Sequence, residues 1–254
     1  MKITFLGTGT SQGVPVIACG CDVCSSENPK DKRLRVSVMI EVDDKKVVID
    51  SGPDFRAQML RENVKTLDAV VFTHEHKDHI AGLDDVRAFN YFSGKSMDVF
   101  ANEQVQVALK REFHYVFSGD NYPGIPKVNV HTINNKESFN VHGINFIPIN
   151  VLHYKLPVLG FRIEDFTYIT DANFISEEEI EKIKGTKVLV LNALRREKHI
   201  SHFTLEEALE LVKKINPEKA YFTHISHQLG LHDEVSKELP SNVELAYDGL
   251  QVDL

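Results

Sequence analysis

The chain lacks the features that mark membrane proteins and proteins that bind long nucleic acids. No apolar run in its 254 residues reaches the length of a membrane helix, about 20 residues, or of a signal-peptide core, ~7–15 residues. Basic residues are in the minority, with 29 Lys and Arg against 37 Asp and Glu, and the formal net charge is −8. Neither a membrane nor long nucleic acid is therefore an expected partner, and the expected location is cytoplasmic.

Cysteine is also scarce, but the three residues are clustered as C-x-C-x-x-C at Cys19, Cys21 and Cys24. An odd number of thiols cannot pair completely, and a reducing cytoplasm does not favour disulfides. Three thiols within six positions can bind one soft cation, which then needs a fourth ligand from elsewhere in the chain. A redox-active pair with a spare thiol is the alternative to a metal site.

Internal repeats, low-complexity tracts and linkers rich in Pro, Gly or Ser are missing as well, so we predict a single domain over residues 1–254. Short β-rich apolar runs alternate with helical patterns, which predicts a layered α/β domain. The predicted strands are 3–6, 36–42, 46–50, 69–72, 99–101, 139–149, 167–170, 188–191 and 220–222. The predicted helices are 54–62, 84–92, 103–115, 176–184, one that begins after Thr204 and ends before Pro217, and 232–238. Hairpin turns are predicted at Asn134-Asn135 and His142-Gly143.

The strongest chemical signal is the segment His74-Glu75-His76-Lys77-Asp78-His79, directly after the strand predicted at 69–72. Three imidazoles and an aspartate lie within six positions at the C-terminal end of a strand, where layered α/β sheets place ligands. Imidazole combined with carboxylate suits zinc, manganese or iron. The spacing therefore favours a metal site over a polar surface loop.

Three further candidate ligands also follow apolar strands, namely His153, Asp171 and His224. Taken singly, a polar residue in such a place is more typical of a cap or of a satisfied core position. Because all three share the placement of the histidine-rich segment, we expect them to meet it at one edge of the sheets.

The order of these residues along the chain resembles the five motifs of the metallo-β-lactamase superfamily. The matching positions are Asp50, the H-x-H-x-D-H segment, His153, Asp171 and His224. The motifs extend over most of the chain. The resemblance implies a four-layer αββα sandwich with a binuclear centre of two divalent ions, zinc or manganese.

The resemblance also divides the donors into two ligand sets that share one carboxylate. One ion would be held by His74, His76 and His153. The other would be held by Asp78, His79 and His224. Asp171 would bridge the two ions, and Asp50 would orient a ligand or the metal-bound water from outside the coordination sphere.

Three segments resemble the PhnP group of this superfamily, whose members are cyclic-phosphate phosphodiesterases: 7–15, the cysteine cluster, and 223–228. By this resemblance, a separate structural zinc is held by Cys19, Cys21, Cys24 and His227. His202, just before the predicted helix, resembles the histidine that the PhnP and tRNase Z groups place near the metals as a general acid. A surface histidine at a helix start is the alternative interpretation.

The resemblance implies a metal-dependent hydrolase that acts on a small anionic phosphodiester, such as a cyclic phosphate, by attack of a metal-bridging hydroxide. Asp78 and His202 are the candidate catalytic residues. Two divalent ions would bring four positive charges, and Asp78, Asp171 and the hydroxide would each bring one negative charge. The remaining local charge of about +1 would attract a phosphodiester anion.

Two alternatives stay open. One is a non-catalytic or cofactor-biosynthesis accessory protein, similar to the pyrroloquinoline-quinone biosynthesis B group. The other is a thioester or other ester hydrolase. Proteins similar to this one are often dimers, so the resemblance also allows a homodimer.

Overall fold

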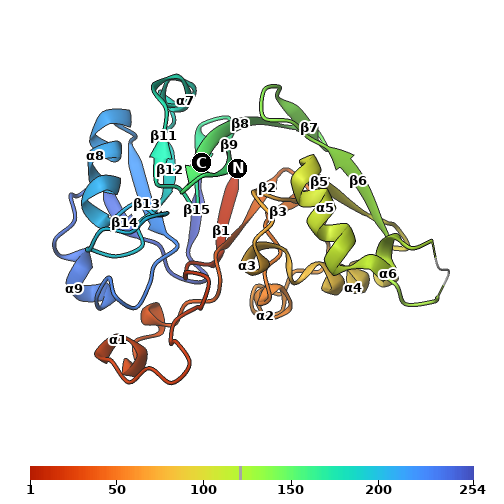
Figure 1. The fold of residues 1–254 in the computed structure, drawn as a ribbon, viewed down its shortest axis with the longest axis horizontal. Coiled ribbons are helices and arrows are strands. Elements are labelled where there is room, and N and C mark those ends of the chain that lie inside the picture. The colour runs from red at the N-terminus through yellow and green to blue at the C-terminus, as the bar shows by residue number, and fades with distance from the viewer. Residues whose placement is uncertain (120–121) are drawn as a thin grey trace.

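Two β-sheets lie face to face at the centre of the computed structural model, which describes residues 1–119 and 122–254 (Figure 1). Within those residues, the first sheet consists, in spatial order, of β15 (Gln251–Asp253), β1 (Lys2–Gly7), β2 (Ser37–Val42), β3 (Lys45–Ile49), β4 (Ala69–Val71), β5 (Met97–Ala101) and β6 (Val128–Thr132). The second sheet consists of β11 (Phe174–Ile175), β8 (Ile144–His153), β9 (Leu156–Ile163), β10 (Phe166–Tyr168), β12 (Val188–Asn192), β13 (Lys219–Thr223) and β14 (Val243–Leu245). β7 (Phe139–Val141) pairs with β8 outside this order.

Helices cover the outer face of each sheet (Figure 1). Over the first sheet lie α2 (Phe55–Arg61), α3 (Lys77–Ile80), the 3₁₀ helix Leu83–Val86, α4 (Arg87–Ser93), α5 (Glu103–Glu112) and α6 (His114–Phe117). Over the second lie α7 (Glu177–Ile183), α8 (Leu205–Ile215) and α9 (His232–Ser236). The loop between β1 and β2 contains α1 (Asp22–Ser25) and the 3₁₀ helix Pro29–Asp31. No helix in the described part of the chain is both long and apolar enough to cross a membrane.

The layers follow from the alternation of side chains along each strand. In β3, Val47 and Ile49 point into the core between the sheets, while Val48 points to the helices over the first sheet. In β12, Val190 points between the sheets and Leu191 points to the helices over the second sheet. Strands that are covered on both faces must be apolar at successive positions, which is why these runs show no polar alternation. The predicted αββα sandwich is confirmed.

The two predicted hairpin turns have different outcomes. His142 and Gly143 have φ values of 51° and 97° and join the antiparallel strands β7 and β8, so this prediction is confirmed. The turn at Asn134-Asn135 is wrong, because the strands on its two sides belong to different sheets. β6 pairs in parallel with β5, and the chain crosses to the second sheet after it.

One edge of the sandwich receives the ends of several strands. In the first sheet β3 and β4 run parallel, and in the second sheet β10, β12 and β13 run parallel. β8 has the same direction as β10, because both are antiparallel to β9. The residues that follow these strands are the ones for which the sequence predicts chemistry.

The packing of the core between the sheets can be tested at Phe161, which is fully buried. The centroid of its ring is 5.8 Å from that of Phe146 and 5.9 Å from that of Phe139. We expect Phe161→Ala to lower the free energy of unfolding by about 3–5 kcal/mol, because it removes the ring and leaves a cavity. Chemical denaturation measures this change. The control is Tyr91→Ala, at a ring that is 82% exposed, with an expected change within about 0.5 kcal/mol. Equal losses in both variants would contradict this packing of Phe161.

Candidate metal centre

The predicted donors come together at the shared edge of the two sheets. The histidine-rich segment leads from β4 into α3, and Asp50 directly follows β3. From the second sheet, His153 ends β8, Asp171 follows β10 and His224 follows β13. Loops from both sheets therefore build the site.

Four of these donors form one compact group. The potential ligand atoms of Asp78, His79, Asp171 and His224 all lie within 4.8 Å of one another. His79 Nε2 is 3.3 Å from Asp78 Oδ2 and 3.2 Å from Asp171 Oδ2. His224 Nε2 is 3.2 Å from Asp171 Oδ1. Nitrogen and oxygen ligands of a tetrahedral zinc ion lie about 3.3 Å apart, so these spacings fit one divalent cation.

The remaining predicted ligands lie beside this group. The ring of His76 is 4.6 Å from that of His74 and 5.1 Å from that of His153, measured between centroids. A second set of ligand atoms within 4.8 Å of one another comes from His153, Asp171 and His202. Asp171 belongs to both sets, as a bridging carboxylate would. The second set differs from the predicted one, because it contains His202 and lacks His74 and His76.

Backbone geometry aims several of these side chains. Asp50, Asp171 and His224 have left-handed φ values of 65°, 52° and 54°. Such conformations are uncommon for residues other than glycine, cost of order 1 kcal/mol or more each, and concentrate at functional sites. Gly52 allows the loop after β3 to pack against α3, because a Cβ atom there would overlap the carbonyl oxygen of Asp78.

Asp50 is the centre of a buried hydrogen-bond network. Its carboxylate accepts hydrogen bonds from the backbone N–H of Thr73 at 2.8 Å and from the Thr73 hydroxyl at 2.7 Å. Its Oδ2 also lies 2.7 Å from His79 Nδ1. With Nδ1–H donating to Asp50, the Nε2 lone pair of His79 points toward Asp78 and Asp171, as a metal ligand requires.

Similar contacts orient two other rings. His153 Nδ1 donates to the carbonyl oxygen of Ser201 at 2.8 Å, and His74 Nδ1 lies 3.0 Å from the hydroxyl of Thr73. The Nε2 nitrogens of the histidines differ from these Nδ1 atoms in their contacts. Among the described residues, no hydrogen-bond partner is found for Nε2 of His74, His79 or His224, although all three atoms are buried. Buried polar atoms are normally paired, so these orphaned nitrogens fit bound cations.

The pKa shifts of the charged groups in the cluster also favour bound cations. Burial alone would lower the pKa of His79, but Asp171, Asp78 and Asp50 outweigh it and raise this pKa well above its ordinary value. Burial would raise the pKa of Asp171, but His224 and His79 outweigh it and hold this pKa well below its ordinary value. Carboxylates that stay ionised in a buried site need positive charge nearby, and divalent cations supply it.

His202 lies at the position for which the sequence predicts a general acid. Its ring centroid is 4.5 Å from that of His153 and 4.6 Å from that of His224. Burial, reinforced by the neighbouring His224, lowers the pKa of His202 to about 2. The ring is therefore neutral at physiological pH, and it offers an N–H donor rather than a charged imidazolium.

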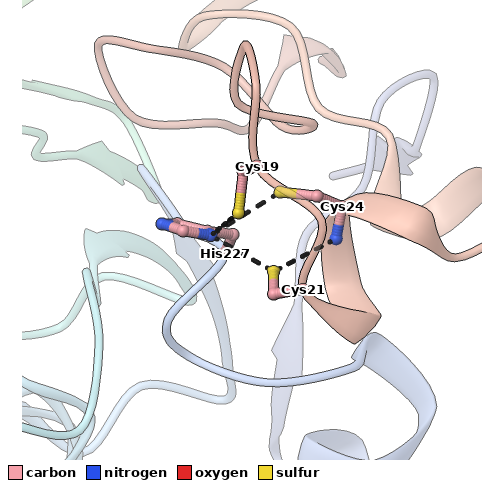
Figure 2. A group of neighbouring side chains, drawn as sticks. All are labelled: Cys19, Cys21, Cys24 and His227. Atoms are coloured by element: carbon pink, nitrogen blue, oxygen red, sulfur yellow. Dashed lines mark hydrogen bonds between the residues drawn. The ribbon is translucent and has the colours of Figure 1, made fainter.

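The cysteine cluster forms a second candidate metal site (Figure 2). Cys19, Cys21 and Cys24 surround His227, with their Sγ atoms 3.4, 3.3 and 3.6 Å from its Nδ1 atom. Sulfur and nitrogen ligands of a tetrahedral zinc ion lie about 3.6 Å apart, so the four side chains match that geometry. Hydrogen bonds from the Cys24 N–H and from His227 lower the pKa of Cys21 to about 6, which favours the thiolate that binds metal.

The cluster connects two distant parts of the chain at the metal edge. His227 is three residues after His224, and the cysteines belong to the loop between β1 and β2. Thr8 at the start of that loop accepts a hydrogen bond from the backbone N–H of Ile225 at 2.9 Å. A metal ion bound to the cluster would therefore hold in place the segment that carries His224.

Two residues of the site carry no strong sequence signal. Thr73 contacts both Asp50 and His74, and its only signal is its position directly before the histidine-rich segment. His199 matches no motif, but its ring centroid lies 5.2 Å from that of His202. The two histidines are only three residues apart, in the segment between β12 and α8, so the spacing H-x-x-H is the local signal that could have indicated their proximity.

Comparison with known proteins places the chain in a family. A model of the β-lactamase superfamily domain matches residues 45–225. The crystal structure of a diphosphatase from the PhnP family has a TM-score of 0.93 and 41% sequence identity, over 100% of this chain and 97% of that one. The chain therefore belongs to the β-lactamase superfamily and, within it, to the PhnP family.

The curated relatives are longer proteins. An octanoyltransferase of Porphyromonas gingivalis is 39% identical over 253 residues, which are 99% of this chain and 51% of that protein. A ribonuclease Z of Prochlorococcus marinus is 26% identical over 170 residues, which are 65% of this chain and 50% of that protein. The chain spans about half the length of the curated relatives it matches, so neither name assigns it an activity.

The cysteine cluster is testable by metal analysis. We expect the purified protein to carry one zinc ion that Cys24→Ser removes, because the hydroxyl is a poor replacement for a thiolate ligand. The thermal midpoint of unfolding should fall together with the zinc content. Elemental analysis and thermal unfolding measure the two quantities. Ser25→Ala, next to the cluster, is the control, and a Cys24→Ser protein with unchanged zinc would contradict the assignment.

Proposed function

We propose that this protein is a metal-dependent hydrolase of small phosphodiesters with a binuclear catalytic centre. The observation that carries the proposal is Asp171, whose buried carboxylate lies within 4.8 Å of ligand atoms of Asp78, His79 and His224 in one group and of His153 and His202 in another. Further support comes from the diphosphatase of the PhnP family, which is 41% identical over nearly its whole length. A phosphate ester or anhydride is therefore the favoured substrate class.

The proposed ligand sets use every donor that the sequence predicts. His74, His76 and His153 would hold the first ion, zinc or manganese. Asp78, His79 and His224 would hold the second, and Asp171 would be shared by the two. Cys19, Cys21, Cys24 and His227 would hold a structural zinc. When bound, two divalent ions supply an activated water at neutral pH and neutralise charge on the phosphoryl oxygens.

The chain's own residues position the substrate and hold the protons. Asp50 keeps the His79 ring in one orientation and one tautomer through the 2.7 Å contact with Nδ1. The His202 ring centroid is 4.5 Å from that of His153 and 4.6 Å from that of His224, which are members of the two proposed ligand sets. We propose that the neutral His202 ring donates a hydrogen bond from its N–H to the leaving-group oxygen and so stabilises the negative charge that develops there.

The completeness of the ligand set favours an enzyme over an accessory protein. A non-catalytic role needs the structural site but does not need three carboxylates gathered around His79. Two ions in addition to one zinc per chain would support catalysis. One zinc alone would support the accessory role.

The proposed activity predicts hydrolysis that depends on added metal. We expect protein loaded with zinc or manganese to hydrolyse bis(p-nitrophenyl) phosphate and at least one compound in a panel of cyclic phosphates and diphosphate diesters. Asp171→Asn should lower the rate by at least about 10²-fold, because it weakens binding of both ions. The matched control is Asp165→Asn, at a carboxylate paired with Lys187 on the surface. No turnover of any compound by the metal-loaded protein would contradict the proposal.

The role of His202 predicts a dependence on the leaving group. We expect His202→Ala to lose about 10²-fold in rate on a substrate with an alkoxide leaving group. The loss should be much smaller with p-nitrophenolate, which leaves without a proton. Metal content should stay unchanged. A variant that loses metal would indicate a ligand, and equal losses on both substrates would contradict a hydrogen bond from His202 to the leaving group.

A further inference from the structure

Asn192, the last residue of β12, forms an unusual contact with the loop that carries Asp171. Its side chain is fully buried. Its Oδ1 accepts a hydrogen bond from the backbone N–H of Ala172 at 2.9 Å, and its Nδ2 donates to the carbonyl oxygen of the same residue at 2.9 Å. One side-chain amide therefore pairs with both backbone groups of one residue, as a neighbouring strand would.

This amide contact fixes the backbone next to the bridging ligand. The N–H of Ala172 belongs to the peptide group that follows Asp171, so its direction depends on the ψ angle of Asp171. Asp171 has a left-handed φ of 52°, a conformation that the surrounding structure must enforce. In this dry environment the hydrogen bond to the Ala172 N–H holds this peptide group in one orientation, and the hydrogen bond to the Ala172 carbonyl holds the next one.

The same carbonyl oxygen connects a second part of the site. The backbone N–H of Phe203 also donates to the Ala172 oxygen, at 2.8 Å, and Phe203 directly follows His202. The Phe203 carbonyl in turn accepts from the N–H of Leu194, two residues after Asn192. The loops of Asp171 and His202 are thus joined to the end of β12.

A third connection runs through the sheet. Asn192 pairs with Thr223 in the parallel ladder between β12 and β13, and Thr223 directly precedes His224. The N–H of Ala193 also donates to the carbonyl of Thr223 at 3.0 Å. Asn192 therefore lies at the point where the segments of Asp171, His202 and His224 meet.

We infer that Asn192 is a positioning residue, which sets the Asp171 carboxylate between the two ligand sets through the Ala172 peptide group. The inference rests on the proposed metal centre and goes beyond it, because Asn192 touches neither substrate nor metal ligand atoms. Apolar residues of similar size would fill the same space but leave the Ala172 N–H unpaired, so the position requires an amide.

Cobalt binding tests this inference without a substrate. A mild chelator removes ions from the His/Asp centre while zinc stays in the cysteine cluster, and Co²⁺ is then titrated and followed by visible absorption. We expect Asn192→Ala to bind Co²⁺ at this centre about 10–100-fold more weakly than the unchanged chain, with an altered absorption band. If Asn192→Ala fails to fold, Asn192→Leu, which keeps the volume, carries the same expectation.

The matched control is Asn150→Ala on β8 of the same sheet. Asn150 also makes two side-chain hydrogen bonds, to the Asn135 carbonyl and to Glu179, at 2.8 and 2.9 Å. We expect the Asn150→Ala protein to lose thermal stability but to keep its Co²⁺ affinity within about twofold of that of the unchanged chain. An Asn192 variant with unchanged affinity and spectrum would overturn the inference. Equal loss of affinity in Asn150→Ala would also overturn it. Because no substrate is present, failure of the phosphodiester proposal alone would leave these results unchanged.

Discussion

The concentration of negative charge around His79 is the constraint on which the rest of the structure depends. Asp50 and Asp171 are fully buried, Asp78 is largely buried, and each has an oxygen within 3.3 Å of a nitrogen of that one ring. Such a group is costly in a protein interior unless cations and hydrogen bonds compensate it. The hydrogen bonds of Thr73 compensate one carboxylate. Bound divalent cations would supply the remaining compensation and would couple metal binding to the folding of this edge.

Because the donors come from both sheets, their separations depend on how the sheets pack. The inter-sheet core fixes the distance between the loops after β3 and β4 and those after β8, β10 and β13. Left-handed residues then turn individual side chains inward. Local restraints act at a third level, through Asn192 on the Asp171 loop and through the cysteine cluster beside His224. Precision at the site therefore comes from several weak restraints that act on different loops.

The sequence predicts the parts of this structure that have local patterns. The H-x-H-x-D-H spacing and the placement of His153, Asp171 and His224 after apolar strands are local, and the structure brings all of them to one edge. β9 lies outside the predicted strands, because Pro157 and Gly160 interrupt its apolar pattern. The prediction of a hairpin turn at Asn134-Asn135 is wrong because the strands before and after it join different sheets, and which sheet a strand joins depends on partners that are distant in the sequence. The contact of Asn192 with Ala172 could not be predicted either, because it joins residues 20 positions apart.

The metal centre sets the reaction class, whereas the surrounding loops select the substrate. Arg195 illustrates how such a loop is built. Its guanidinium donates to the carbonyl oxygens of Glu197 and Lys198 and to Oε1 of Gln228, at 3.1, 3.1 and 2.8 Å. A guanidinium with these three contacts shapes the loop that carries His199 and His202 and is not a free anion-binding group. Since Gln228 adjoins His227, the Arg195–Gln228 hydrogen bond connects this loop to the cysteine cluster. Loss of the cluster would therefore disturb His202 as well as His224.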